Sequence, residues 1–101
     1  MPILRKKRGK MGIYKLTPDA EADLHRIWLR GVREYGEAQA DKYYYDFIER
    51  FEQLAEQPYL YQAVNHIRAG YRHSVCGVDT IYYRVEGDTV EIMNILGQQD
   101  R

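Results

Sequence analysis

The fold of this chain is decided by residues 16–58, which read LTPDAEADLHRIWLRGVREYGEAQADKYYYDFIERFEQLAEQP. Thr17 is a favourable helix N-cap, and Pro18 suits the first helical position, where its missing N–H breaks no hydrogen bond. Apolar residues then recur at steps of three and four, the spacing that places side chains on one face of a helix. These residues are Ala20, Leu24, Ile27, Trp28, Gly31, Val32 and Tyr35. The stretch therefore predicts a helix over residues 18–35 with one buried face.

A second amphipathic helix is predicted almost at once. Gly36 is of the residue type that most often ends a helix, and Pro58 stops the next periodic run, which begins near Glu37. The apolar positions of this run again keep helical spacing: Ala40, Tyr44, Phe47, Ile48, Phe51, Leu54 and Ala55. Because so short a connection cannot carry the chain far, the two helices are expected to form an antiparallel hairpin.

Strand-like segments flank the helical hairpin. Residues 13–16 alternate in polarity before it, and residues 71–76, 80–85 and 89–96 follow it, separated by two short turns that contain glycine. Residues 58–70 are irregular. The order β-α-α-β-β-β predicts an α+β fold in which the helical hairpin packs on one face of a mainly antiparallel sheet.

Length and charge bound the organisation of the chain. Its 101 residues suit one compact domain, and five of its 15 Lys and Arg residues fall within residues 1–10. We expect those ten residues to be a basic, flexible leader and residues 11–101 to be the single domain. Because that domain carries 10 basic against 15 acidic side chains, direct binding to nucleic acid is disfavoured. A lone Cys76 and the lack of a membrane-length apolar run predict a soluble, cytoplasmic protein with no membrane contact.

Few residues offer chemistry of their own. We find no glycine-rich phosphate loop, no metal-ligand spacing and no serine nucleophile elbow, so we expect neither a metal nor a cofactor. Arg72 and His73 could in principle cleave RNA, but neighbours on a strand point to opposite faces. Ten tyrosines are unusual for this length, and exposed tyrosines on an acidic body favour a protein partner over a phosphate backbone. Periodicity assigns Tyr44 and Tyr83 to the core.

Several segments of the chain, in order, resemble ParE-type toxins of bacterial toxin-antitoxin pairs. They are residues 16–24 (LTPDAEADL), Ile27-Trp28, Gln57-Pro58, residues 67–72 (IRAGYR), residues 81–85 (IYYRV) and residues 95–100 (ILGQQD). The resemblance spans about Tyr14 to Asp100 and implies a RelE/ParE-like fold.

The same resemblance implies a function. It predicts a type II toxin that arrests growth by binding DNA gyrase, without chemistry of its own, and that a cognate ParD-like antitoxin neutralises. Contact with DNA would then come only through the antitoxin. RelE members share the fold but cut mRNA on the ribosome, often with a Tyr or His near the C-terminus. Gly97 departs from the family pattern, which commonly has His there, so two alternatives stay open: a RelE-type endoribonuclease, and a weakened relic that only binds its antitoxin.

Candidate contact residues follow from this hypothesis. We expect Arg72 and Arg84, on neighbouring strands, to lie on one exposed side that faces the target, with a second contact region at the C-terminus. That region comprises Gln98, Gln99, Asp100 and Arg101. For the antitoxin, the hydrophobic candidates outside the predicted core are Leu29, Tyr43 and Tyr45.

Overall fold

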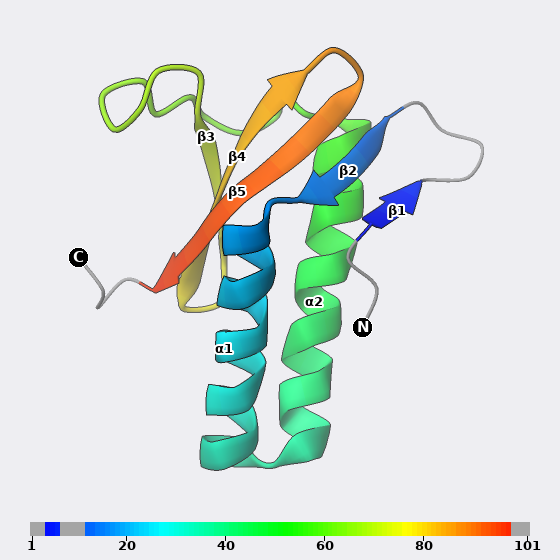
Figure 1. Ribbon diagram of the computed structural model, residues 1–101, viewed down its shortest axis with the longest axis vertical. Helices are drawn as coiled ribbons and strands as arrows, with labels where there is room; N and C mark the ends of the chain where they lie inside the picture. The colour runs from blue at the N-terminus through cyan, green and yellow to red at the C-terminus, as the bar shows by residue number, and fades with distance from the viewer. Residues whose placement is uncertain (1–3, 7–11, 98–101) are drawn as a thin grey trace.

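The computed structural model describes residues 4–6 and 12–97 as a helical hairpin packed on a five-stranded sheet (Figure 1). The elements are β1 (Leu4–Lys6), β2 (Ile13–Leu16), α1 (Pro18–Tyr35), α2 (Glu37–Glu56), β3 (Arg72–Cys76), β4 (Asp79–Glu86) and β5 (Thr89–Gly97). From β2 onward this is the predicted order β-α-α-β-β-β, and the α+β prediction is confirmed. The predicted bounds of β2 agree with the observed ones, and those of β3, β4 and β5 differ by at most one residue at either end.

The sheet is mainly antiparallel, as predicted. Its strand order is β1-β2-β5-β4-β3, and only the β2–β5 pair among the described strands is parallel. The segment β3-β4-β5 is a meander, in which Gly77 and Gly87 take the positive φ that tight turns require.

One strand was not predicted. Leu4–Lys6 pairs with β2, where the sequence predicted no strand, and the flexible leader over residues 1–10 stays a prediction. The physical reason is that pairing to an open sheet edge uses backbone groups, which side-chain patterns do not reveal. The other leader residues lie outside the described part of the chain, and the domain boundary at residue 11 stays a prediction.

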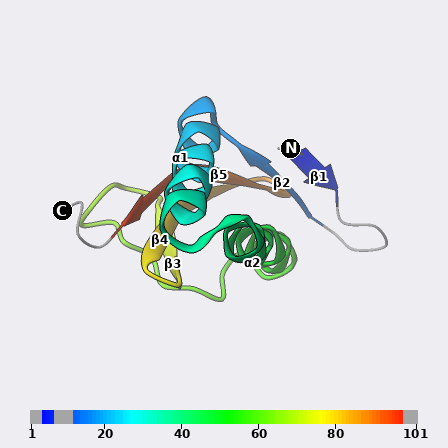
Figure 2. The same cartoon turned by 90° about the horizontal axis from the view of Figure 1, so that it is seen from below.

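The helical hairpin is fastened to the sheet at its beginning. The Thr17 side-chain oxygen accepts a hydrogen bond from the Ala20 N–H (3.0 Å) and donates one to the Met93 carbonyl (2.9 Å). A single residue, Gly36, joins the two helices. Figures 1 and 2 show both helices on one face of the sheet, with the end at Gly36 extending beyond the strands.

The core lies between α2, α1 and the central strands. All seven apolar residues predicted for the second helix are buried, and so are Tyr44 and Tyr83. On α1, Ala20, Leu24 and Ile27 are buried, whereas Tyr35 is 72% exposed. The prediction of a buried Tyr35 is wrong, because Tyr35 is the last residue of α1 and this end of the hairpin extends beyond the strands (Figure 1).

Candidate functional site

A buried carboxylate sits where the helical hairpin passes the turn between β3 and β4. Asp79 is fully buried as the first residue of β4, because its side chain points to the helix side of the sheet. The Arg30 Nη2 lies 3.2 Å from Asp79 Oδ2, and the Tyr43 hydroxyl lies 2.9 Å from the same oxygen. A buried carboxylate requires such partners, because burial without them costs several kcal/mol.

The Tyr43 hydroxyl also holds the turn itself. It accepts a hydrogen bond from the Val78 N–H (3.1 Å), and it lies 2.9 Å from the Cys76 carbonyl, the alternative acceptor for its single proton. Burial, followed by the contact with Asp79, raises the pKa of Tyr43 well above its usual value. The hydroxyl is therefore a fixed internal link between α2 and the turn.

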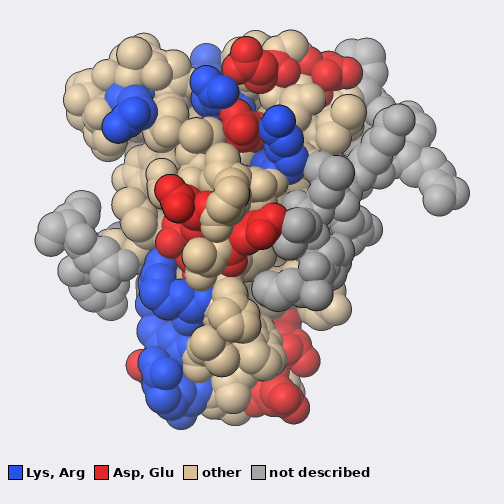
Figure 3. Space-filling view, in the orientation of Figure 1, with Lys and Arg blue, Asp and Glu red and all other residues tan. Residues whose placement is uncertain are grey.

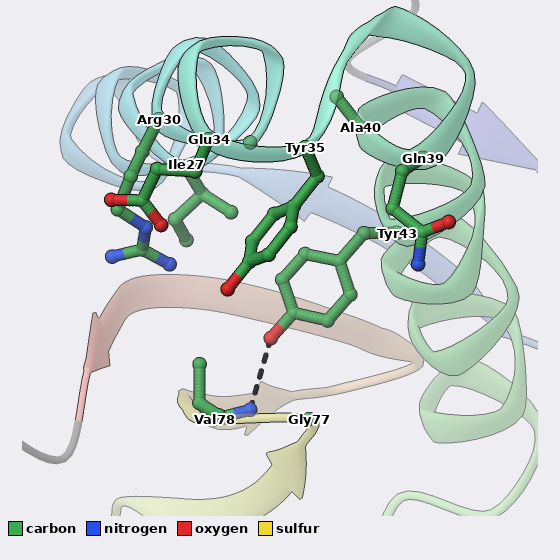
Figure 4. Close-up of a pocket in the computed structure, with 10 residues that line it drawn as sticks. Ile27, Arg30, Glu34, Tyr35, Gln39, Ala40, Tyr43, Gly77 and Val78 are labelled. Atoms are coloured by element: carbon green, nitrogen blue, oxygen red, sulfur yellow. Dashed lines mark hydrogen bonds between the residues drawn. The ribbon is translucent and has the colours of Figure 1, made fainter.

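A cleft of about 360 Å³ opens beside this link, between the end of the hairpin and the turn. Its apolar lining includes Ile27, Gly31 and Ala40, and polar side chains including Arg30 and Glu34 stand at its mouth. Figure 4 shows Tyr35 and Tyr43 side by side, both pointing from the hairpin towards Gly77 and Val78.

Arginines line up along α1 next to this cleft. Arg26, Arg30 and Arg33 follow the i, i+4, i+7 spacing of one helix face, and we call them the arginine ridge. Figure 3 shows Lys and Arg atoms gathered along this part of α1, at the lower left. This ridge was not predicted from the sequence, although its helical spacing is visible there.

The arginine ridge runs beside the end of β5. The Arg26 Nη2 donates to the Ile95 carbonyl (3.2 Å) and lies 3.4 Å from Asp23 Oδ1. Asp79, which pairs with Arg30, is opposite Gly97 in the sheet. Among the described residues, Arg33 has no ion-pair partner.

Arg84, a candidate target-binding residue, lies on the sheet face that the helices leave open. Its Nε donates to Glu91 Oε1 (2.8 Å), and Glu86 Oε1 lies 3.4 Å from its Nη2. The hydrogen bond that Arg84 donates to Glu91 raises the pKa of the Arg84 guanidinium. Arg84 is exposed, but two carboxylates already offset its charge.

Arg72 lies on the other face. It is opposite Tyr83, and cross-strand partners share a face, whereas Arg84 follows Tyr83 and points away. The Arg72 Nη1 donates to the Tyr61 carbonyl (2.7 Å), and its guanidinium lies 4.9 Å from the centre of the Tyr59 ring. The expectation that Arg72 and Arg84 share one exposed side is therefore wrong, because strand alternation separates them.

The remaining candidate residues do not form one patch. Leu29 and Tyr45 are exposed, at 43% and 60%, whereas the Tyr43 hydroxyl is used inside the fold. Gln98, Gln99, Asp100 and Arg101 lie outside the described residues. Their roles, and that of Arg84, stay predictions.

The described residues form neither a metal site nor a membrane-spanning helix. No group of three or more His, Cys, Asp or Glu side chains in residues 4–6 and 12–97 is placed to hold a metal ion. Neither described helix is long and apolar enough to cross a lipid bilayer.

Comparison of the sequence with known proteins finds one family. Residues 14–101 match the family model for the ParE toxin of the type II toxin-antitoxin system parDE. The chain is 38% identical over 85 residues to Toxin ParE1 of Caulobacter vibrioides, covering 84% of this chain and 88% of that protein. It is 33% identical over 87 residues to Toxin ParE1 of Mycobacterium tuberculosis, covering 85% of this chain and 89% of that protein. These matches confirm the resemblance found in the sequence.

Solved structures share the fold. A chain of the chromosomal ParDE system from P. aeruginosa superposes with a TM-score of 0.73 at 24% identity, covering 83% of this chain and 92% of that one. A chain of the RelBE2 toxin-antitoxin complex from Mycobacterium tuberculosis gives a TM-score of 0.59 at 20% identity, covering 87% and 99%. At these identities the likeness concerns the fold alone.

Proposed function

Because this chain belongs to the ParE toxin family of type II toxin-antitoxin systems, we propose that it arrests growth by binding DNA gyrase and that a cognate ParD-like antitoxin neutralises it. The observation that carries the proposal is the family match over residues 14–101. On this proposal the toxin acts in the cytoplasm and meets DNA only through the antitoxin.

The geometry favours binding over cleavage of a covalent bond. Arg72 and His73, the pair that could act on RNA, point to opposite faces of the sheet, and the Arg72 guanidinium is occupied by Tyr61 and Tyr59. Large apolar side chains stand on the surface instead, among them Tyr35, Tyr45 and Tyr59, each at least 60% exposed. Exposed aromatic side chains are typical of protein-binding surfaces.

The gyrase-facing region is proposed to include Arg84 and residues 98–101. Arg84 stands on the open sheet face, and residues 98–101 continue from Gly97 at the end of β5. Arg84 pairs with Glu91 and Glu86 through Nε and Nη2, and the remaining N–H donors of its exposed guanidinium would bind an acceptor group of the target.

A supercoiling assay with purified gyrase tests the target. Wild-type protein is expected to block supercoiling, and Arg84→Glu is expected to require more protein for the same block, because the change reverses a charge at the proposed contact. Arg68→Glu, on the exposed segment between α2 and β3, serves as the matched control and should behave as wild type. Normal supercoiling at saturating wild-type toxin would reject gyrase as the target.

Two further measurements separate the alternatives. The first is mRNA cleavage in a purified translation reaction. Cleavage by the wild-type protein that disappears in the double variant Arg72→Ala/His73→Ala would establish a RelE-type endoribonuclease instead. Tight binding of the antitoxin without any growth defect on induction would establish a relic.

A further inference from the structure

Charged side chains form a row across three neighbouring strands, on the sheet face that the helices leave open. Lys15 on β2 is the register partner of Glu91 on β5, and Glu91 is the register partner of Arg84 on β4. Register partners project from the same face of a sheet. Because the residues before and after Lys15 and Glu91 are buried towards the helices, the row itself lies on the open face.

Both oxygens of the Glu91 carboxylate have a cationic partner in this row. Glu91 Oε1 accepts a hydrogen bond from Arg84 Nε (2.8 Å), and Glu91 Oε2 lies 3.9 Å from Lys15 Nζ. The Glu91 side chain is 17% exposed, whereas that of Arg84 is 45% exposed. The carboxylate is therefore held between its two neighbours, and it holds the more exposed side chain of Arg84 in turn.

This contact leaves one end of the Arg84 guanidinium available. A guanidinium carries one N–H on Nε and two on each Nη. Glu91 accepts the Nε hydrogen bond, and Glu86, whose side chain is 68% exposed, lies 3.4 Å from Nη2. Among the described residues, Nη1 has no ion-pair or hydrogen-bond partner. The Nη1 hydrogens, with one hydrogen of Nη2, can therefore bind an acceptor that offers two oxygens, such as a carboxylate.

Stability alone is a weak reason for this arrangement. Ion pairs near the surface contribute little, because water already solvates both charges and ordering two long side chains costs entropy. Long-range attraction is also small, since the charges of Lys15 and Arg84 are balanced by those of Glu91 and Glu86. What the contact with Glu91 changes is the freedom of Arg84. A long side chain that is already ordered loses less entropy when a partner binds it.

We propose that Glu91 is a positioning residue for target binding: it holds Arg84 by Nε, so that the Nη1 end of the guanidinium is free to bind a carboxylate of the target. This role rests on the proposed function, since it presupposes gyrase as the target and Arg84 as a contact. Glu91 itself touches no target group, and its effect passes through Arg84. A carboxylate that only neutralised Arg84 would have the opposite effect, because its removal would strengthen binding to an acidic group.

Supercoiling assays with purified gyrase separate these two roles by the amount of toxin needed for a half-maximal block. Glu91→Ala is expected to raise that amount about threefold to tenfold, because Arg84 must then be ordered on binding. Glu91→Gln keeps an acceptor for Nε and should stay within about twofold of wild type. The matched control, Glu86→Ala, removes a carboxylate from the same guanidinium without freeing Nε and should also stay within about twofold.

A double variant shows whether Glu91 acts through Arg84. Arg84→Ala is expected to weaken the block by itself, and adding Glu91→Ala to it should have no further effect. A merely structural role of Glu91 would instead add its full effect in the Arg84→Ala background. Urea unfolding of each variant checks that the domain stays folded.

Three results would overturn the positioning role and leave gyrase as the target. The first is an unchanged or smaller half-maximal amount in Glu91→Ala. The second is a loss in Glu91→Gln as large as that in Glu91→Ala, which would assign the effect to charge. The third is a wild-type block by Arg84→Ala, or a full effect of Glu91→Ala in that background. Normal supercoiling at saturating wild-type toxin would overturn both the positioning role and the proposed target.

Discussion

Replacing Tyr43 by Phe tests the link between the helical hairpin and the turn of β3 and β4. The substitution keeps the ring, which packs edge-on against Phe47 at a centroid distance of 4.9 Å, and removes only the hydroxyl. That hydroxyl accepts one hydrogen bond, from Val78, and donates one, to either Asp79 or Cys76. The change therefore removes two hydrogen bonds without opening a large cavity.

The expected cost follows from what each partner loses. The Val78 N–H is exposed, so water replaces the lost bond at little cost. Asp79 is fully buried, its Oδ1 has no hydrogen-bond partner among the described residues, and of the partners described for Oδ2 only Arg30 would remain. Since a hydrogen bond to a charged group contributes about 1.5–3 kcal/mol, we expect Tyr43→Phe to lower the free energy of unfolding by about 2–3 kcal/mol. For a domain of this size that corresponds to a fall of roughly 10–20 °C in Tm.

Urea unfolding at pH 7, followed by circular dichroism, measures this change. Tyr45→Phe is the matched control, because Tyr45 is 60% exposed on the same helix and should change stability by less than about 0.5 kcal/mol. A loss below about 0.5 kcal/mol in Tyr43→Phe would refute the view that this hydroxyl supports buried Asp79.

Three further predictions concern other positions in the fold. The Cys76 thiol is buried and burial raises its pKa, so a thiol reagent should react with it only as fast as the protein unfolds; rapid reaction in the native state would contradict this. Burial raises the pKa of Tyr83 to about 12, so the folded state keeps a proton that the unfolded state loses near pH 10. The stability from Tyr83 should therefore be complete below about pH 10 and decline as pH rises towards about 12, and urea midpoints of Tyr83→Phe should fall less steeply over that range. Gly12→Ala should cost more than about 2 kcal/mol, because φ is +102° and a Cβ would lie 2.1 Å from the Ala55 carbonyl oxygen, whereas Gly87→Ala, with open space around it, should cost about 1 kcal/mol; equal midpoints in thermal melts would contradict the difference.

Local patterns predicted the helices well because the interactions that start and stop them are local. The Thr17 side chain caps α1 by accepting a hydrogen bond from the Ala20 N–H in the first turn. Gly36 ends α1, and α2 begins at the next residue. All seven apolar residues predicted for α2 are buried, because the whole apolar face of this helix packs against the rest of the domain. Tyr35 has the same spacing but lies beyond the strands, and no local pattern tells how far a helix extends past its sheet.

The candidate site was harder to predict because it depends on pairing across the chain. Arg72 and Arg84 were expected to lie on the same face of the sheet, but the face of each side chain depends on how the strands pair. Arg72 is opposite Tyr83, so Arg84, the next residue, points to the other face. Asp79 reads in the sequence as part of a turn, yet the register against Gly97 makes it the first residue of β4 and buries it. Its partners Arg30 and Tyr43 are 49 and 36 positions away in the chain, so no motif could have joined them.

The buried ion pair of Arg30 and Asp79 is better explained by the place where it holds Arg30 than by a contribution to the stability of the fold. Apolar residues of similar volume would often stabilise a fold as well as a buried ion pair, because both charges must lose their water. The pair instead fixes Arg30 at the mouth of the cleft and helps to hold the turn that forms its wall.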